Sequence, residues 1–168
     1  HFSFSSILRG IISEAEKHEY MTFILCSDES YELEKTQIQR LLNKNVDGIF
    51  LSIADKTHDL THIQNIMERD TNLVIFDKYS KLTPCSSVVI NDRKAAYTAV
   101  EHLIKKGKKR IAHFRGPLLP PNSIDRFLGY RQALEENGLE FDKDLVFICD
   151  GISDTEGYDH MQHILDQK

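Results

Sequence analysis

The chain has 168 residues, of which 40% are hydrophobic and 28% charged, and its formal net charge is −5. This composition excludes a disordered or collagen-like chain, and no apolar run approaches the roughly 20 residues that a membrane-spanning helix needs. The acidic balance argues against nucleic-acid binding by this segment itself, because a DNA surface needs clustered lysine and arginine. Three widely spaced cysteines without a C-x-x-C pair favour free thiols in a reducing cytoplasm over a zinc site or a disulfide scaffold.

Short apolar runs alternate along the chain with longer amphipathic stretches. Apolar residues at helical spacing predict helices within residues 7–15, 33–42, 60–67, 95–104, 127–134 and 153–168. Apolar runs between them predict strands at residues 21–26, 49–53, 73–76, 87–90, 110–114 and 145–148, and those at 21–26 and 110–114 are typical of buried strands. Asn91 and Asp92 can cap the fourth helix, which Gly107 ends, and Gly138 closes the fifth. Residues 153–156 have the spacing of a capping box for the last helix.

This alternation predicts the α/β class, with right-handed βαβ units and parallel sheets. The chain starts and stops on a helix, without the strands that would complete a parallel sheet, which indicates a fragment of a longer protein. The only dense basic run, residues 105–110, straddles a predicted helix end. Cations at the C-terminal end of a helix interact favourably with the helix dipole. Stabilisation of the helix end is therefore a simpler interpretation of this run than a contact with nucleic acid.

Polar residues follow the predicted strands at their carboxyl ends, where ligands bind in open α/β sheets. They are Ser27, Asp28, Ser52, Asp77, Asn91, Asp92, Arg115 and Asp150. Such a ring of donors and acceptors suits a hydroxylated or amide-bearing small molecule. Each residue taken alone is explained as well by the preference of Asp, Asn and Ser for loops and caps.

The motifs of phosphate-binding loops, dinucleotide folds, zinc proteases and serine hydrolases are all missing, so we expect no enzyme and no cofactor. His58 and His62 are four residues apart and could share a helix face, and His160 and His163 are three apart beside Asp159. Either pair could in principle ligate a metal ion, but no third ligand is evident and no metal site is predicted.

Seven segments in order resemble the effector-binding core of LacI-type bacterial transcription regulators. They are FSSILRGI (4–11), NVDGI (45–49), VIFD (74–77), SVVIND (87–92), AVEHLI (99–104), KGKKRIA (106–112) and RFLGYR (126–131). The resemblance covers nearly the whole chain. It implies the fold of periplasmic sugar-binding proteins, with two Rossmann-like lobes, parallel sheets and a ligand cleft between them. Residues 1–90 would form the N-terminal lobe without its first strand, and residues 91–168 part of the C-terminal lobe.

The resemblance also implies a set of ligand contacts. Asp77 matches an acidic residue that bonds ligand hydroxyls, and Arg126 matches an arginine that reaches into the cleft. Phe2 and Phe4 fall in a segment that lines the pocket, although from the residues alone either ring could instead belong to the core. Asn91 and Asp92 lie at the crossover, as hinge or ligand contact. Two features depart from the family pattern: Lys78 stands where arginine often follows the aspartate, and prolines precede Arg126 at positions 120 and 121.

The implied function is that of a cytoplasmic, ligand-responsive regulator whose effector is a sugar or a related metabolite. Family members dimerise, and the apolar faces of 7–15 and 33–42 are candidates for part of that surface, unless they only cover their own sheet. Operator DNA would be bound only through an N-terminal head absent from this chain, and no membrane is involved. The alternative is a periplasmic-type sugar-binding protein that serves transport or chemotaxis.

Overall fold

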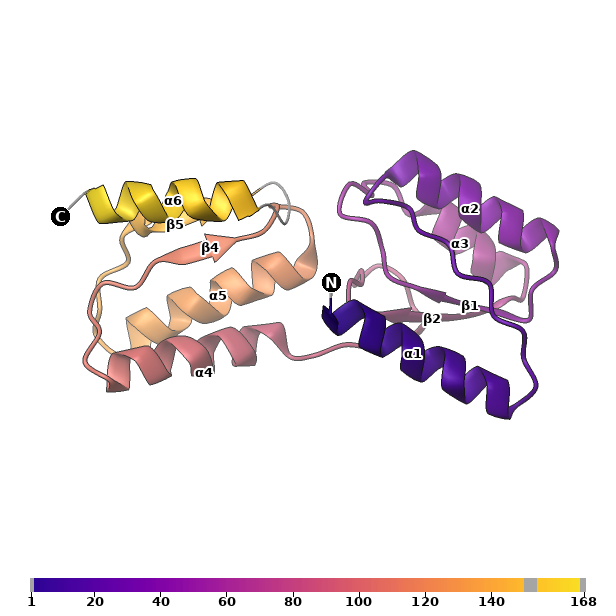
Figure 1. The fold of residues 1–168 in the computed structure, drawn as a ribbon, viewed down its shortest axis with the longest axis horizontal. Helices are drawn as coiled ribbons and strands as arrows, with labels where there is room; N and C mark the ends of the chain where they lie inside the picture. The colour runs from indigo at the N-terminus through magenta and orange to yellow at the C-terminus, as the bar shows by residue number, and fades with distance from the viewer. Residues whose placement is uncertain (1, 150–153, 167–168) are drawn as a thin grey trace.

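The structure is a computed structural model, and it describes residues 2–149 and 154–166. Helices alternate with parallel strands that form two separate sheets, which confirms the predicted α/β class (Figure 1). The capping residue expected at position 153 and the strand-end residue Asp150 lie outside the described residues. Within these residues, no helix combines the length and the apolar character needed to cross a membrane.

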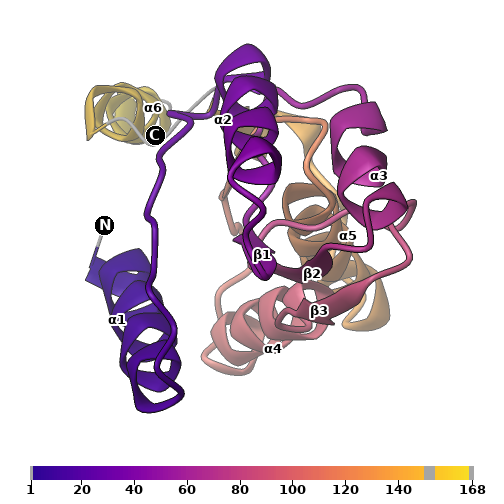
Figure 2. The same cartoon turned by 90° about the vertical axis from the view of Figure 1, so that its right-hand side faces the viewer.

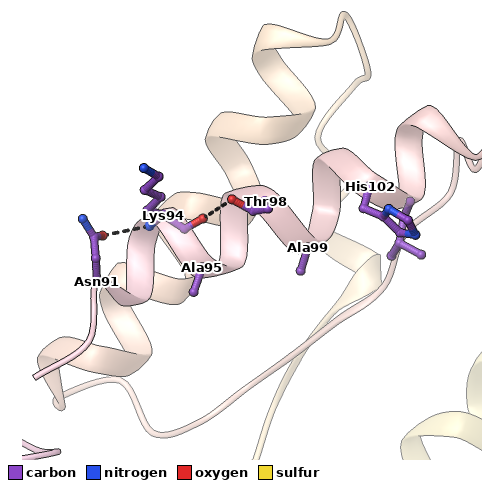
Figure 3. Close-up of a pocket in the computed structure, with 7 residues that line it drawn as sticks. Asn91, Lys94, Ala95, Thr98, Ala99 and His102 are labelled. Atoms are coloured by element: carbon purple, nitrogen blue, oxygen red, sulfur yellow. Dashed lines mark hydrogen bonds between the residues drawn. The ribbon is translucent and has the colours of Figure 1, made fainter.

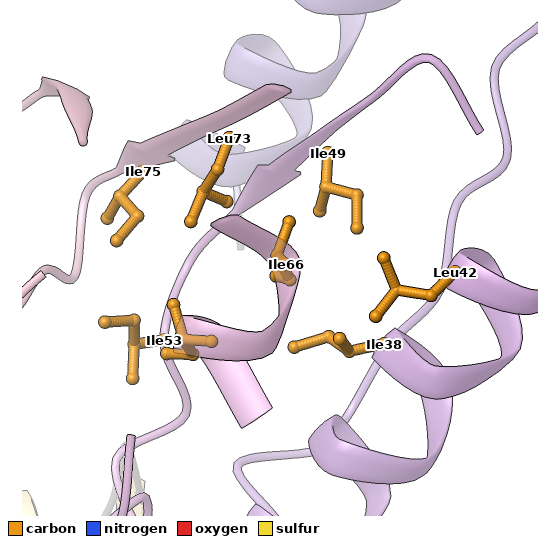
Figure 4. Packing of buried hydrophobic residues seen from close by; sticks show 8 residues of the cluster. Ile38, Leu42, Ile49, Ile53, Ile66, Leu73 and Ile75 are labelled. Atoms are coloured by element: carbon orange, nitrogen blue, oxygen red, sulfur yellow. The ribbon is translucent and has the colours of Figure 1, made fainter. Parts of the chain in front are cut away.

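The N-terminal half, residues 2–90, is built around a sheet of order β1-β2-β3 with all pairs parallel. Its elements are α1 (Phe2–Lys17), α2 (Tyr31–Asn43), β1 (Gly48–Leu51), α3 (Thr61–Glu68), β2 (Asn72–Phe76) and β3 (Ser86–Val88). The apolar faces of α2 and α3 pack on the sheet, as their helical spacing predicts. The buried cluster comprises Ile38, Leu42, Ile49, Ile53, Ile63, Ile66, Leu73 and Ile75 (Figure 4).

The C-terminal half, residues 91–166, is built around a sheet of two parallel strands, β4 and β5. Its elements are α4 (Asp92–Lys105), β4 (His113–Arg115), α5 (Pro121–Glu136), a 3-10 turn (Lys143–Leu145), β5 (Val146–Ile148) and α6 (Asp154–Asp166). Helices α4 and α5 pack closely at Gly129, where an added Cβ would clash with the carbonyl oxygen of Arg93. Tyr130 is fully buried and donates its hydroxyl proton to the Ile111 carbonyl at 2.9 Å.

The predicted ends of the central helices are confirmed. Asn91 caps α4, because its side-chain oxygen accepts the Lys94 N–H at 2.9 Å. Gly107 and Gly138 follow α4 and α5 with φ of +79° and +70°, the left-handed conformation that favours glycine at a helix end. The basic run therefore straddles the end of α4, as expected.

The prediction of a buried strand at residues 21–26 is wrong. This segment contains no assigned strand, and its apolar side chains are exposed, with Met21 at 82% and Phe23 at 61%. Figure 2 shows it running alone between α1 and α2. A strand needs a neighbour for its backbone N–H and C=O groups, and β1 pairs only with β2 among the described residues. The strand predicted at 110–114 also differs, since β4 begins at His113 and is only partly buried.

The two halves face each other through the carboxyl ends of their strands. In Figure 1, β4 points toward the N-terminal half, and both α4 and α5 begin on that side. The segment between β3 and α4 joins the two halves. The polar residues that follow the strands are therefore concentrated where the halves approach each other.

Candidate functional site

Asp77 and Lys78 leave the carboxyl end of β2 toward the C-terminal half. Asp77 has a φ of +60°, and its backbone N–H donates to the Val88 carbonyl at 3.2 Å, which fixes the direction of the chain after the strand. The Lys78 ammonium lies 2.5 Å from a Glu29 carboxylate oxygen and 3.0 Å from one of Asp55. Burial lowers the pKa of Lys78, but the bonds to Glu29 and Asp55 outweigh it, so this pKa lies above its ordinary value. Lys78 thus connects the end of β2 with Glu29, which precedes α2, and with Asp55, which follows β1.

Asp92 and Arg126 form an ion pair within the C-terminal half. Arg126 Nε donates to Asp92 Oδ1 at 2.6 Å. The Asp92 side chain is 4% exposed, whereas that of Arg126 is 50% exposed. Asp92 begins α4 and Arg126 lies in the second turn of α5, so the packing of these helices brings the pair together. The buried carboxylate orients a guanidinium whose other edge remains open to solvent.

A hydrogen bond joins the two halves beside this ion pair. The Tyr79 hydroxyl donates to Asp125 Oδ2 at 3.2 Å. Burial, followed by the charge and hydrogen bond of Asp125, raises the pKa of the Tyr79 hydroxyl. Tyr79 lies two residues after Asp77, and Asp125 precedes Arg126, so the bond brings the neighbourhoods of both predicted ligand contacts close to each other. Neither Tyr79 nor Asp125 was predicted from the sequence, because Tyr79 lies in a polar connection without any motif.

The predicted aromatic wall is represented by Phe4. Its ring stacks on that of Phe76 with centroids 5.7 Å apart. Phe76 is the last residue of β2 and directly precedes Asp77, so Phe4 lies next to the carboxyl end of that strand. The side chain of Phe2 lies outside the described part of the structure.

Two basic side chains on β4 lie between the strand and α5 without hydrogen-bond partners for their buried nitrogens. The His113 ring stacks on Tyr130 with centroids 4.8 Å apart, and the Arg115 guanidinium carbon lies 4.6 Å from the centre of the Phe127 ring. Neither His113 Nε2 nor Arg115 Nε has a hydrogen-bond partner. Burial, with the charges of Arg115 and Arg126, lowers the pKa of His113 to about 4. The sequence reading named Arg115 but regarded His113 only as part of a strand.

One hollow of the surface lies outside this region. It is a mostly apolar groove of about 790 Å³ along α4 (Figure 3). It is lined by Asn91, Lys94, Ala95, Thr98, Ala99, His102 and Leu103. Of the predicted ligand contacts, only Asn91 lines it, and the Asn91 side chain is already engaged in capping α4.

The two histidine pairs that could in principle ligate a metal ion have other surroundings. His58 precedes α3, so it does not share a helix face with His62, which is buried and donates to Glu34 Oε1 at 2.8 Å. The His160 and His163 rings contact Phe147. Across residues 2–149 and 154–166 there is no group of three or more His, Cys, Asp or Glu side chains suited to a metal ion.

Comparisons with known proteins agree with this architecture. The family model described as periplasmic binding proteins and sugar binding domain of LacI family matches residues 1–168. The transcriptional regulator MalR of Streptococcus pneumoniae is 31% identical over 156 residues, which are 92% of this chain and 46% of MalR. The transcriptional repressor PurR of Vibrio atlanticus is 29% identical over 88% of this chain and 45% of its own length. The chain therefore spans about half the length of the curated relatives it matches.

A solved structure gives the same assignment. The transcription regulator CcpA of Lactococcus lactis superposes with a TM-score of 0.86 and 29% identity, covering 98% of this chain and 59% of that one. The Cra regulator of Pseudomonas putida, solved in complex with fructose 1-phosphate, also has a TM-score of 0.86, but at 19% identity it supports the fold alone. These relatives are regulators, so the alternative of a transport protein is set aside. The chain belongs to the family of periplasmic binding proteins and LacI-type sugar-binding domains, and it corresponds to the effector-binding core of a LacI-type transcription regulator.

Proposed function

We propose that the chain binds a small effector of the sugar class between an N-terminal lobe, residues 1–90, and a C-terminal lobe, residues 91–168. The observation that carries this proposal is the hydrogen bond from Tyr79 to Asp125, which links the two halves within two residues of Asp77 and next to Arg126. Polar groups from both halves thus converge where the carboxyl ends of parallel strands face each other, the position at which α/β sheets bind ligands.

Each of the predicted contacts has a role in this proposal. Asp77 accepts hydrogen bonds from effector hydroxyls, and the open edge of the Arg126 guanidinium donates to effector oxygens, while Asp92 orients that guanidinium. Phe4, stacked beside β2, or Phe2 supplies an apolar wall for a sugar ring. Asn91 marks the hinge, because it caps α4 at the point where the chain enters the second lobe.

The remaining parts of the proposal concern the whole protein. Closure of the lobes on the effector would change how two copies present DNA-binding heads that lie outside this chain. A homodimer in the cytoplasm suits this function, because a palindromic operator requires two heads. The side chain of Ile7 on α1 is 40% exposed, which supports that face as part of the dimer surface. No catalysed reaction is assigned.

Calorimetric titration of the full-length protein with a panel of pentoses, hexoses and disaccharides tests the proposal. Arg126→Ala should weaken the tightest sugar by about tenfold or more, since 1.4 kcal/mol of lost interaction is a factor of ten. Arg131→Ala is the matched control, because Arg131 lies on the same helix, where it pairs with the exposed Glu135 and packs on the Phe141 ring. Equal affinities in wild type and Arg126→Ala would contradict the proposed site.

A further inference from the structure

Arg115, the last residue of β4, has an enclosed side-chain nitrogen without a partner among the described residues. Arg115 Nε is buried and makes no hydrogen bond, and among the described residues no carboxylate lies within ion-pair distance of its guanidinium. The nearby carboxylates have other partners: Asp92 accepts from Arg126, and Asp125 accepts from Tyr79. Arg115 is otherwise only partly buried, so the unsatisfied group is this enclosed Nε–H and not the whole charge. A buried donor without an acceptor is unfavourable, which points to an acceptor that arrives from outside.

Arg115 packs the face of its guanidinium on an aromatic ring. The face of the group lies over the Phe127 ring, at 4.6 Å from guanidinium carbon to ring centre, which offsets part of the desolvation of the charge. Stacking occupies the flat face only, and the N–H groups point outward in the plane. This arrangement suits bidentate donation to a carboxylate or a phosphate.

The start of α5 adds positive potential to this end of the strand. Its first turn contains no acidic residue, and its N-cap, Pro120, provides no side-chain cap, although Asn122 Oδ1 accepts the Ser123 N–H at 2.8 Å. The positive end of the helix dipole therefore meets no charge within that turn, and the Asp125 carboxylate in the next turn is bonded to Tyr79. Ser123 in that turn donates its hydroxyl proton to the Gly116 carbonyl at 3.0 Å, which fixes the turn after Arg115 against the helix start. The effect of this potential is visible at His113, whose pKa is lowered by burial and then by the charges of Arg115 and Arg126.

We propose that Arg115 and the first turn of α5 form an anion subsite, so that the effector is a sugar derivative carrying a phosphate or a carboxylate. This inference rests on the proposed function, since it places the anion at the strand ends of the C-terminal lobe beside Arg126. Arg126 contacts the hydroxylated part of the effector, and Arg115 selects the charged one.

The first experiment uses inorganic phosphate alone on the full-length protein. Thermal unfolding is followed with about 10 mM phosphate, with acetate as the carboxylate arm and chloride at matched ionic strength as the reference. Phosphate, acetate or both should raise Tm relative to chloride, and Arg115→Met should remove the difference. Arg110→Met is the control, because Arg110 is an exposed cation just before β4. The inference is overturned if neither anion acts, or if Arg115→Met responds as wild type does.

A second experiment measures anion binding at the subsite directly. Anion binding near His113 should move its pKa from about 4 upward, because a negative charge favours the protonated ring; NMR titration of the His113 ring signals measures this. Glucose, glucose 6-phosphate and glucuronate then form a matched calorimetric series, with ribose and ribose 5-phosphate as a second. The anionic members should bind at least about tenfold tighter than the neutral parent, and Arg115→Met should abolish only that preference.

The two proposals fail in different ways. If neutral sugars bind through Arg126 without any preference for their anionic derivatives, the anion subsite is wrong and the effector site stands. If phosphate stabilises the protein through Arg115 while Arg126→Ala leaves every sugar affinity unchanged, the proposed effector site is wrong instead.

Discussion

Each half of the molecule encloses a histidine, His62 buried and His113 partly buried, and the two differ in what surrounds them. In the N-terminal half, Glu34 accepts hydrogen bonds from the Ala54 N–H at 2.6 Å, from the Thr57 hydroxyl at 2.8 Å and from His62 Nε2 at 2.8 Å. In the C-terminal half, His113 lies near the charges of Arg115 and Arg126, and no carboxylate in the described part of the chain pairs with it. The first arrangement is a structural network, because its charge is almost fully satisfied internally. In the second arrangement, the positive charge beside His113 is not balanced until an anion binds.

The buried atom without a hydrogen-bond partner in the Glu34 network, His62 Nδ1, costs a different free energy from Arg115 Nε in the C-terminal half. His62 Nε2 lies 2.8 Å from Glu34 Oε1, and His62 Nδ1 is the one buried atom of that network without a hydrogen-bond partner among the described residues. Arg115 by contrast retains its charge at every ordinary pH. An unpaired buried cation is far less favourable than an unpaired imidazole nitrogen. The comparison therefore assigns stability to the Glu34 network and ligand recognition to Arg115.

The largest expected effect comes from breaking the Glu34 network. Glu34→Ala removes one acceptor from three donors at a position 2% exposed, and should lower the free energy of unfolding by about 3 kcal/mol or more. Glu34→Gln should cost less, because its amide oxygen still accepts from Ala54. Glu32→Ala, at an exposed site on the same helix, is the control and should change stability by about 0.5 kcal/mol at most. Urea unfolding measures all three, and a small loss in Glu34→Ala would refute the structural role.

Much of this architecture could be predicted from the sequence, but the difference between the surroundings of His62 and His113 could not. Helix spacing, the caps at Asn91 and Gly107, and the parallel α/β class follow from local chemistry, so they could be predicted. Residues 21–26 could not, because an apolar run becomes a buried strand only when another strand pairs with it. Arg126 was found through the resemblance, whereas its pairing with Asp92 depends on the packing of α4 against α5. His113 and Tyr79 carry no motif, and only tertiary structure gives them partners.

A pH dependence of stability should come from the C-terminal half. The pKa of His113 is lowered from 6.5 to about 4 in the folded chain. Below pH 6.5 the unfolded chain therefore binds a proton that the folded chain does not, so this contribution is fully present above pH 6.5. It is lost as the pH falls toward 4, with a slope of up to about 1.4 kcal/mol per pH unit. Urea unfolding across that range should show the slope reduced in His113→Phe and unchanged in His102→Gln, an exposed site on α4.

The smallest expected effect concerns the bond between the two halves. Tyr79→Phe removes a 3.2 Å hydrogen bond to Asp125 and should lower stability by about 1 kcal/mol or less. Tyr31→Phe is a matched control, because the Tyr31 hydroxyl also donates to a carboxylate at 3.2 Å, but to Asp59 within the N-terminal half. Similar losses of stability are expected from both. Only Tyr79→Phe should increase the radius of gyration in small-angle X-ray scattering, because only that bond restrains the distance between the halves. If the two variants scatter identically, the connection before α4 and the packing around it set the arrangement, and the Tyr79 hydroxyl does not.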